Sequence, residues 1–404
     1  MIMPENITQE ICNSYLRCPV CHTEGVLHIE NESQKIICKN CSTIYPIAHA
    51  IPALMAHDEI HSLSYQFLGL DNINPVSNPY VQKKITIFFI LRAAIYAIAS
   101  EFLYLVIGVF LWLRIPKKIF RKFFLWTRGT NYSNEVKRAL YYGWNNYFNL
   151  ILKAGEIGAF NRMKIYINEP SLEIGCGSCQ TTNMIFRDSL SVTFGCEYFM
   201  DTYLSSPEDM YKVIRHYVGG SIKSLPFSSN VLESVYLVHI VDHITLLDDW
   251  FKEIHRVIKP KGYLVIDTYS KHVFDLLPGV IWRAKISKKW AENYKSSRIS
   301  RENPNRGVIP LKSDNKYYAT GQNMFSLDEW YAVAEKYGFT LVDHYCFTSS
   351  LFSFFMDIEY RGYYPTLMGS IPIYLAIDEE IAREKAEFLT EKEAGNIILA
   401  FQKK

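Results

Sequence analysis

The length, composition and charge of the chain exclude several classes of protein. It has 404 residues, of which 49% are hydrophobic and 21% charged, so a large apolar core is available and the chain is not disordered. The net charge of +2 predicts no general attraction to nucleic acid. Nine cysteines are too few for a disulfide scaffold in a chain of this length. The polar first ten residues argue against a cleaved secretory signal, and we expect a cytoplasmic protein.

Four cysteines near the start of the chain have the spacing of a zinc site. Two Cys-x-x-Cys pairs are separated by sixteen residues; they are Cys18 with Cys21, and Cys38 with Cys41. Four thiolates complete a tetrahedral Zn²⁺ site and leave no position for a substrate, so we expect a structural ion. Two disulfides or four unrelated thiols are the alternatives. The segment 15–56 resembles the short zinc ribbons that precede some bacterial methyltransferase domains, and we assign residues 1–60 to such a ribbon.

A hydrophobic insert at 61–143 follows the ribbon. Residues 85–113 are long enough for a transmembrane helix, but they contain two ionisable side chains, which are costly inside a bilayer. Residues 116–126 predict a helix with lysine and arginine on one face and phenylalanine and isoleucine on the other, as in helices that lie among lipid headgroups. We therefore expect a helical insert that contacts the cytoplasmic face of a membrane through 85–126. A buried helical hairpin is the alternative.

From residue 144 to the end, short apolar runs alternate with segments of helical periodicity. This pattern predicts an α/β domain at 144–404 with a doubly wound, Rossmann-like parallel sheet. Insertions interrupt it at 271–322 and 346–390. Ser326 and Glu329 form a capping box, which predicts the start of a helix. The expected strands are Ser171–Ile174, Val192–Cys196, Val235–Val238, Tyr263–Asp267, Phe339–Val342 and Asn396–Phe401.

Glycines and a carboxylate follow the first two expected strands. Gly175 and Gly177 come directly after the first strand, where glycines let the backbone pass close to a nucleotide ligand. Glu197 ends the second strand, where an acidic side chain accepts hydrogen bonds from ribose hydroxyls. A tight structural turn and an exposed surface glutamate are the alternatives.

Four segments resemble, in the same order, the type 11 branch of the class I S-adenosylmethionine-dependent methyltransferases. They are 172–179, 219–227, 235–244 and 253–264. The resemblance implies an enzyme of this type, with S-adenosyl-L-methionine as cofactor. It also implies that Glu173, Gly175 and Gly177 hold the methionine end of the cofactor, that Glu197 binds the ribose, and that Ser221 and Ile222 flank the adenine. Cys179 stands where relatives have a third glycine, and Ser221 where many have an aspartate; we expect cofactor binding to survive both differences.

Two histidines and an aspartate follow the fourth expected strand, beside the expected position of the methyl group. A base is needed only when the acceptor atom carries a proton, and an imidazole suits that role. We therefore expect a catalytic role among His239, Asp242 and His243. Asp242 is expected to orient an imidazole or to help hold a divalent ion. Structural packing of His243 is the alternative.

Both insertions carry features that suit an amphiphilic acceptor. The segment 282–306 is rich in lysine and arginine, whereas 351–356 and 360–375 are aromatic and apolar. Such surfaces suit a molecule with an anionic head and an apolar tail; a solvated charged face beside ordinary core is the alternative. The sequence thus predicts methylation, at oxygen, of a lipid or lipid-linked small molecule. An RNA base methyltransferase and a methyltransferase-fold scaffold without turnover are the competing interpretations.

Overall fold

The structure is a computed structural model that describes twelve parts of the chain. They are residues 6–30, 34–48, 50–56, 147–177, 179–186, 192–198, 213–244, 247–276, 309–310, 317–318, 323–349 and 388–404. Within these parts, no helix has the length and apolar character that a membrane crossing requires. The predicted helical insert at 61–143, with its segment 85–126, lies outside them.

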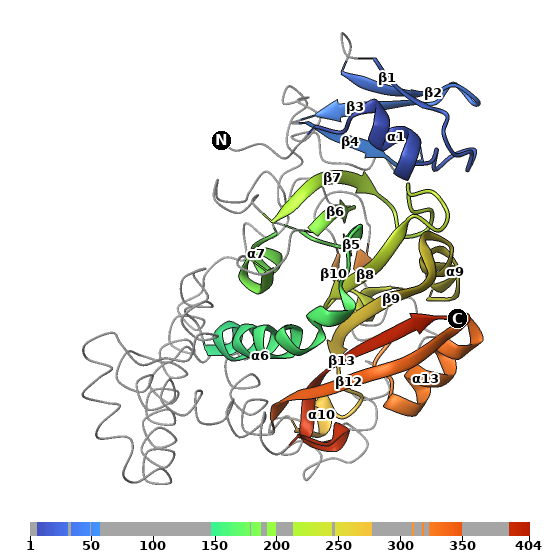
Figure 1. Cartoon of the computed structure of the whole chain (residues 1–404). Helices are drawn as coiled ribbons and strands as arrows, with labels where there is room; N and C mark the ends of the chain where they lie inside the picture. Colours follow the sequence, from blue (N-terminus) through green and yellow to red (C-terminus); the bar gives the residue numbers. More distant parts are fainter. Residues whose placement is uncertain are drawn as a thin grey trace, which may run out of the picture.

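One mixed sheet runs through the described fold from the ribbon to the last strand (Figure 1). Its strands lie in the order β1-β2-β3-β4-β7-β6-β5-β8-β9-β13-β12. The ribbon supplies β1 (Leu27–Glu30), β2 (Lys35–Cys38), β3 (Ile44–Ala48) and β4 (Ile51–Leu54). The rest of the chain supplies β5 (Ser171–Ile174), β6 (Val192–Glu197), β7 (Ile214–Gly220), β8 (Leu232–Val238), β9 (Ile258–Tyr269), β12 (Phe339–Ser349) and β13 (Ala394–Lys403). A separate hairpin consists of β10 (Ile309–Pro310) and β11 (Tyr317–Tyr318).

From residue 144 onward, the strands of the large sheet agree with the prediction except at two elements. All six expected strands are present as β5, β6, β8, β9, β12 and β13. The first exception is β7, which the prediction omits because a charged residue and two terminal glycines interrupt its apolar run. The second is the direction of β13, which pairs antiparallel with both β9 and β12. The sheet is therefore mixed: the predicted doubly wound, Rossmann-like sheet is confirmed, and the alternation of strands and helices does not reveal that β13 runs antiparallel.

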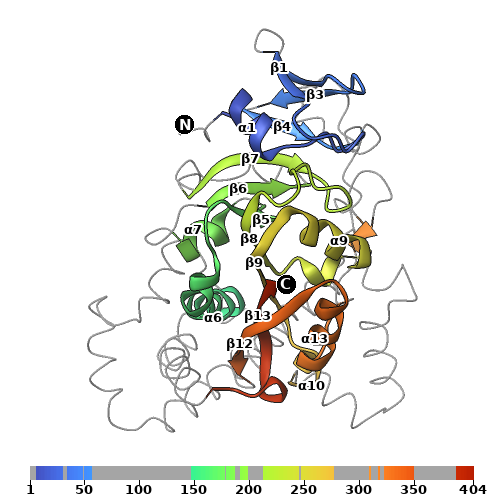
Figure 2. The ribbon, with the colours of Figure 1, turned by 45° about the vertical axis from the view of Figure 1, so that its right-hand side comes forward.

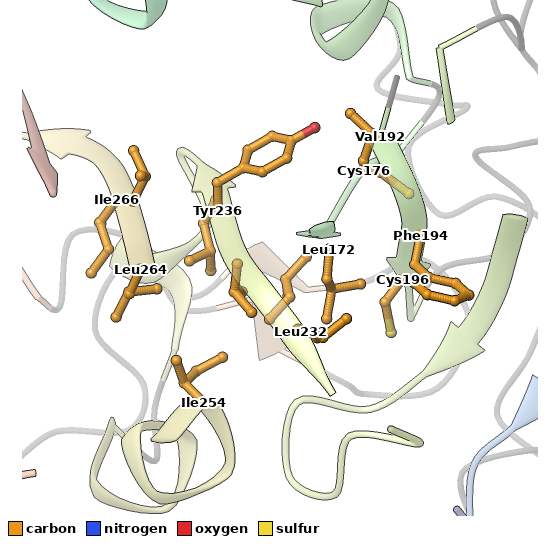
Figure 3. Packing of buried hydrophobic residues seen from close by; sticks show 14 of the residues in the cluster. Leu172, Cys176, Val192, Phe194, Cys196, Leu232, Tyr236, Ile254, Leu264 and Ile266 are labelled. Carbon is orange, nitrogen blue, oxygen red and sulfur yellow. The ribbon is translucent and has the colours of Figure 1, made fainter. Parts of the chain in front are cut away.

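Helices cover both faces of the sheet (Figure 2). They are α6 (Tyr147–Met163) and α7 (Gln180–Phe186) on one face, and α9 (Leu247–Val257) and α13 (Leu327–Lys336) on the other. Tyr236 of β8 contacts Phe160 of α6 and Phe186 of α7, with ring centroids 6.1 and 5.3 Å apart. Ile254 of α9 lies on the opposite side of β8 (Figure 3). The core therefore consists of two apolar layers that hold the central strands between them.

Several short helices complete the described chain. They are α1 (Gln9–Tyr15), α10 (Val273–Leu276) and three 3₁₀ turns, η2 (Lys164–Tyr166), η4 (Val241–His243) and η5 (Glu391–Glu393). The predicted capping box opens α13: the Ser326 hydroxyl accepts a hydrogen bond from the Glu329 amide, and the Glu329 carboxylate accepts one from the Ser326 amide.

The ribbon extends the sheet instead of standing apart from it. β4 pairs in parallel with β7, with Leu54 opposite Gly220. The chain that enters the ribbon runs beside the loop after β7, where the Arg17 amide donates to the Pro226 carbonyl at 3.2 Å. Without the ribbon, β7 would be an edge strand with unpaired backbone groups, which promote association. The ribbon therefore covers one edge of the sheet.

A buried ion pair adds side-chain contacts to this junction. Arg17 Nη2 lies 2.8 Å from Glu253 Oε2, with side-chain exposures of 7% and 16%. Arg17 Nε also donates to the Leu225 carbonyl at 3.2 Å, and Arg256 forms a second pair with Glu253 at 2.8 Å. Burial alone raises the pKa of Glu253, but hydrogen bonds and charge from the two guanidinium groups outweigh it and hold this pKa below its usual range.

Three long segments outside the described residues follow elements at one end of the sheet. The strands β4, β7, β6, β5, β8 and β9 are parallel, and β12 runs in the same direction because the antiparallel β13 lies between β12 and β9. The segment 57–146 follows β4, 277–308 follows β9 and α10, and 350–387 joins β12 to β13. All three therefore begin next to the carboxyl ends of the parallel strands, where open α/β sheets bind ligands.

The Arg17 pair gives a test of how firmly the ribbon is attached. Arg17→Met keeps much of the side-chain length but removes the charge, so Glu253 and the Leu225 carbonyl each lose a partner. We expect the free energy of unfolding to fall by about 2–4 kcal/mol. Chemical denaturation of the full, zinc-loaded chain measures it. The control is Lys35→Met, whose pair with Glu30 is more exposed and should contribute under about 1 kcal/mol. Equal losses in both variants would contradict the buried attachment.

Candidate functional site

The four predicted zinc ligands meet in one cluster. Cys18 Sγ lies 3.6 Å from Cys41 Sγ, and Cys21 Sγ lies 3.6 Å from Cys38 Sγ. All four sulfur atoms lie within 4.8 Å of one another. A zinc ion with Zn–S bonds of about 2.3 Å places its sulfur ligands about 3.8 Å apart, so the cluster fits Zn²⁺ with small adjustments. No disulfide links these cysteines.

Two matching backbone turns explain this geometry. The residue after each Cys-x-x-Cys pair has a positive φ, 59° at His22 and 57° at Ser42. Their amides donate to the carbonyls of Cys18 and Cys38, each at 2.9 Å. These turns bring both sulfur atoms of a pair to the same side of the backbone. His22 Nδ1 lies 3.4 Å from the hydroxyl of Ser224, so the imidazole faces the loop after β7.

The glycine turn after β5 lies against the loop after β8 and leaves space on its other side. Gly175 and Gly177 have φ of 70° and 51°, a backbone conformation that favours glycine. A Cβ atom at Gly175 would lie 2.5 Å from Ile240 Cδ1, so a side chain there would have to displace Ile240 as well as adopt a strained φ. A Cβ atom at Gly177 would meet no described atom within 4 Å. A ligand can therefore approach the backbone at Gly177, which suits a nucleotide cofactor.

Cys179 keeps the turn that a third glycine forms in relatives. Its φ is 59°, and its amide closes the turn by donating to the Cys176 carbonyl at 2.8 Å. Its side chain is fully buried and lies in contact with the Tyr217 hydroxyl. A small buried side chain thus occupies a position that favours glycine without opening the turn.

Glu197 connects the glycine turn to the neighbouring strand. It ends β6, and its Oε2 accepts a hydrogen bond of 2.7 Å from the Gly177 amide. The backbone of Glu197 lies opposite Gly219 of β7, two residues before Ser221. Ser221 and Ile222 follow β7 directly, and the Ser221 hydroxyl accepts from the Lys223 amide at 3.4 Å. The predicted cofactor residues therefore lie at the carboxyl ends of three adjacent strands, β5, β6 and β7.

Glu173 is held inside the protein. It is 2% exposed, and its Oε2 accepts hydrogen bonds from the Thr182 hydroxyl and, at 2.8 Å, from the Tyr236 hydroxyl. Burial raises the pKa of Glu173 to about 7, although both hydrogen bonds favour the ionised form. Glu173 thus fixes α7 and β8 around the glycine turn. A cation bound near it would favour its ionised form.

His239 lies between two buried carboxylates that the sequence analysis did not single out. Its Nε2 is 3.1 Å from Glu156 Oε1 and 3.8 Å from Asp267 Oδ2. Glu156 lies on α6, and Asp267 lies near the end of β9, where its carbonyl accepts from the His239 amide at 3.0 Å. The ring of Tyr269 lies 4.8 Å from the imidazole, measured between ring centroids. His239 itself has a φ of 52°.

The charges in this cluster shift one another's protonation. Burial lowers the pKa of His239, but Asp267 and Glu156 outweigh it, and the net pKa is raised. Burial raises the pKa of Asp267 to about 7. Burial also acts to raise the pKa of Glu156, but Lys153, which lies 2.8 Å away, and His239 bring it below its usual value. The protonation of Glu156, His239 and Asp267 is therefore interdependent: a change at one side chain shifts the pKa values of the others.

The other two catalytic candidates lie in the turn after β8. Asp242 is 2% exposed and lies in η4, and its charge acts on Asp267. The backbone of His243 lies in the same turn, but its side chain is outside the described part of the structure. The described carboxylates next to His239 are thus Glu156 and Asp267. Asp267 ends a predicted strand, and a polar residue at the end of a strand could have been recognised as a candidate site residue from the sequence. Glu156 lies inside an apolar helix, where nothing in the sequence distinguishes it.

Comparisons with known proteins agree with both parts of the chain. The methyltransferase domain family matches residues 172–266, and the Trm112p-like protein family matches residues 15–48. A UPF0434 protein of Methylobacillus flagellatus is 44% identical over 48 residues, which are 12% of this chain and 75% of that protein.

Two solved structures are similar in fold. The [4+2]-cyclase SpnF has 14% identity and a TM-score of 0.37 over 62% of this chain and 81% of that chain. An S-adenosylmethionine dependent methyltransferase from Mesorhizobium loti has 10% identity and a TM-score of 0.34 over 60% and 97%. At these values neither similarity bears on the acceptor of this chain. The family matches and the cysteine cluster confirm the predicted methyltransferase fold, the cofactor S-adenosylmethionine and the structural zinc ribbon.

The Glu197 contact gives a test of the cofactor site. Glu197→Ala removes the carboxylate beside Gly177, so we expect the dissociation constant for S-adenosylmethionine to rise about tenfold or more. Isothermal titration calorimetry measures it. The control is Glu233→Ala, which removes a half-buried carboxylate at the opposite end of the sheet, paired with Lys259 at 2.7 Å. An unchanged constant in Glu197→Ala would refute the ribose assignment.

Proposed function

This chain belongs to the S-adenosylmethionine-dependent methyltransferases and carries a Trm112p-like zinc ribbon, and we propose that it methylates a hydroxyl group of a lipid or lipid-linked small molecule. The observation that carries the proposal is the buried acid and histidine cluster of Glu156, His239 and Asp267, next to the cofactor turn. Methyl transfer needs such a group only when the acceptor atom carries a proton. An acceptor hydroxyl is therefore favoured over an unprotonated nucleophile.

The described residues supply position and charge for this reaction. Gly175 and Ile240 lie in contact, so the cofactor turn and the turn that bears His239 are adjacent. When bound, S-adenosylmethionine supplies an electrophilic methyl group, which the acceptor oxygen takes with release of S-adenosylhomocysteine and a proton. His239 has a side-chain exposure of 15%, whereas Glu156 has none. His239 is thus the member of the cluster with some exposed side-chain surface, although both of its ring nitrogens are buried, and we propose that the cluster acts on the acceptor oxygen.

The lipid character of the acceptor rests on three segments and on where they join the fold. The segments 57–146, 277–308 and 350–387 contain the aromatic, apolar and basic stretches of the sequence. Each begins at the end of the sheet where the parallel strands finish, which is also the end that carries the cofactor turn. Apolar and cationic side chains around the acceptor suit a molecule with an anionic head and an apolar tail. We extend the proposal to a protein that works at the cytoplasmic face of a membrane.

Transfer of a labelled methyl group tests the acceptor class. The full chain is incubated with methyl-deuterated S-adenosylmethionine and, in separate reactions, with lipid vesicles and RNA from the source cells. We expect label in the lipid fraction, at an ether or ester oxygen, and less of it when residues 85–126 are deleted. Label in RNA would support a base methyltransferase instead. Absence of both cofactor binding and label would support a scaffold without turnover.

The role of His239 is tested with a variant that tolerates its backbone. Because φ at His239 is 52°, asparagine is a better replacement than alanine. We expect His239→Asn to lower kcat by about 10²–10⁴ and to leave the affinity for S-adenosylmethionine within twofold, because the cofactor contacts lie on the preceding strands. The control is His344→Asn, at an exposed position of β12. A variant with normal kcat would contradict the assignment.

A further inference from the structure

We infer that Glu156, His239 and Asp267 form a binding site for one divalent cation, to which an oxygen of the acceptor is added as a further ligand. This inference extends the proposed function. The statement that an acceptor oxygen joins the ion rests on that proposed function. The binding of the ion itself rests only on these three side chains.

The donor atoms have the separations that an ion requires. His239 Nε2 lies 3.1 Å from Glu156 Oε1 and 3.8 Å from Asp267 Oδ2, and the three atoms lie within 4.8 Å of one another. Neighbouring ligands of an octahedral ion with bonds of about 2.1 Å are about 3.0 Å apart. The pair of His239 and Glu156 already has this spacing, and the two pairs that include Asp267 approach it when the Asp267 side chain moves. Three such ligands leave further positions open for oxygen atoms of the acceptor or water.

Asp267 gives an independent indication of a missing ligand. Its side chain is completely buried, and neither carboxylate oxygen has a hydrogen-bond partner among the described residues. The Asp267 carboxylate points toward the imidazole of His239, with Oδ2 3.8 Å from Nε2. Buried carboxylates are normally paired, hydrogen-bonded or bound to a metal, because an unpaired one is costly. A bound cation would satisfy Asp267 where the described protein does not.

The balance of charge also favours a cation. Three buried carboxylates act on one another here, those of Glu156, Asp242 and Asp267. The described ammonium group that faces them is Lys153, whose Nζ lies 3.0 and 2.8 Å from the two oxygens of Glu156. Lys153 therefore offsets the carboxylate of Glu156. A divalent ion would offset the charge of Asp267 while His239 stays neutral, as a metal ligand must.

The ligand set indicates the class of ion. Two carboxylates and one imidazole suit Mn²⁺ and neighbouring first-row divalent ions, whereas the thiolate cluster of the ribbon selects zinc. Added Mn²⁺ should therefore leave the zinc ion of the ribbon in place. With the ion bound, His239 acts as a ligand, and the proton of an ion-bound hydroxyl is lost to solvent.

Binding of Mn²⁺ to the full, zinc-loaded chain tests the site without cofactor or acceptor. We expect electron paramagnetic resonance to show one bound Mn²⁺ per chain, with spin-echo modulation from one imidazole nitrogen. Glu156→Gln and Asp267→Asn should each weaken binding about tenfold or more. The control is Asp343→Asn, a partly exposed carboxylate paired with Arg162 at 3.4 Å, which should leave binding within twofold. Zinc content and S-adenosylmethionine affinity report whether each variant has folded.

Each result decides a separate point. Absence of Mn²⁺ binding at millimolar concentration, or binding that keeps its strength and nitrogen signal in Glu156→Gln and Asp267→Asn, overturns the cation site. The nitrogen modulation in the unmodified chain needs no variant, so its absence also overturns the site if a variant does not fold. A protein that binds Mn²⁺ as expected but methylates no lipid overturns the proposed function alone. A protein that methylates lipid without binding Mn²⁺ overturns the cation site alone.

Discussion

The register of the central parallel strands is the constraint on which the candidate site depends. Because β5 and β6 pair in parallel, the turn after β5 and the last residue of β6 come to the same level of the sheet. The Gly177 amide then reaches the Glu197 carboxylate at 2.7 Å. A slip of one residue would turn Glu197 to the opposite face of the sheet. Buried apolar residues at the same level of the two strands, such as Leu172 and Phe194, hold this register.

The zinc ribbon acts on the same strands from the outer edge. A ribbon of this size has too small a core to fold without its metal, yet its last strand forms the neighbour of β7. The ribbon also holds the loop after β7, where the Ser224 hydroxyl donates to the Pro19 carbonyl at 3.2 Å. That loop contains Ser221 and Ile222, the predicted adenine contacts. Metal binding in the ribbon is therefore connected to the cofactor site through backbone pairing and through this loop.

The sequence alone is sufficient for the parts of the fold that local motifs specify. The Cys-x-x-Cys spacing predicts the metal cluster, and the glycines after β5 predict the cofactor turn, because each depends on a few residues close in the chain. The sequence alone does not predict the strand β7, the position of the ribbon against the sheet, or the contact between Glu156 and His239. Those depend on packing between distant segments. A single glutamate in an apolar helix does not show which strands the helix packs against, or which side chains at the ends of those strands lie near the glutamate.

The concentration of carboxylates at this edge of the sheet has a consequence for binding. Glu173, Asp242 and Asp267 are buried there, and burying carboxylates in an apolar interior costs free energy unless a cation or a proton offsets it. The pKa of about 7 for Glu173 reflects that cost. The methyl donor is a sulfonium cation, and its product after transfer is a neutral thioether. Buried carboxylates at this end of the sheet therefore favour a ligand that brings positive charge close to them, as the sulfonium donor does and the thioether product does not.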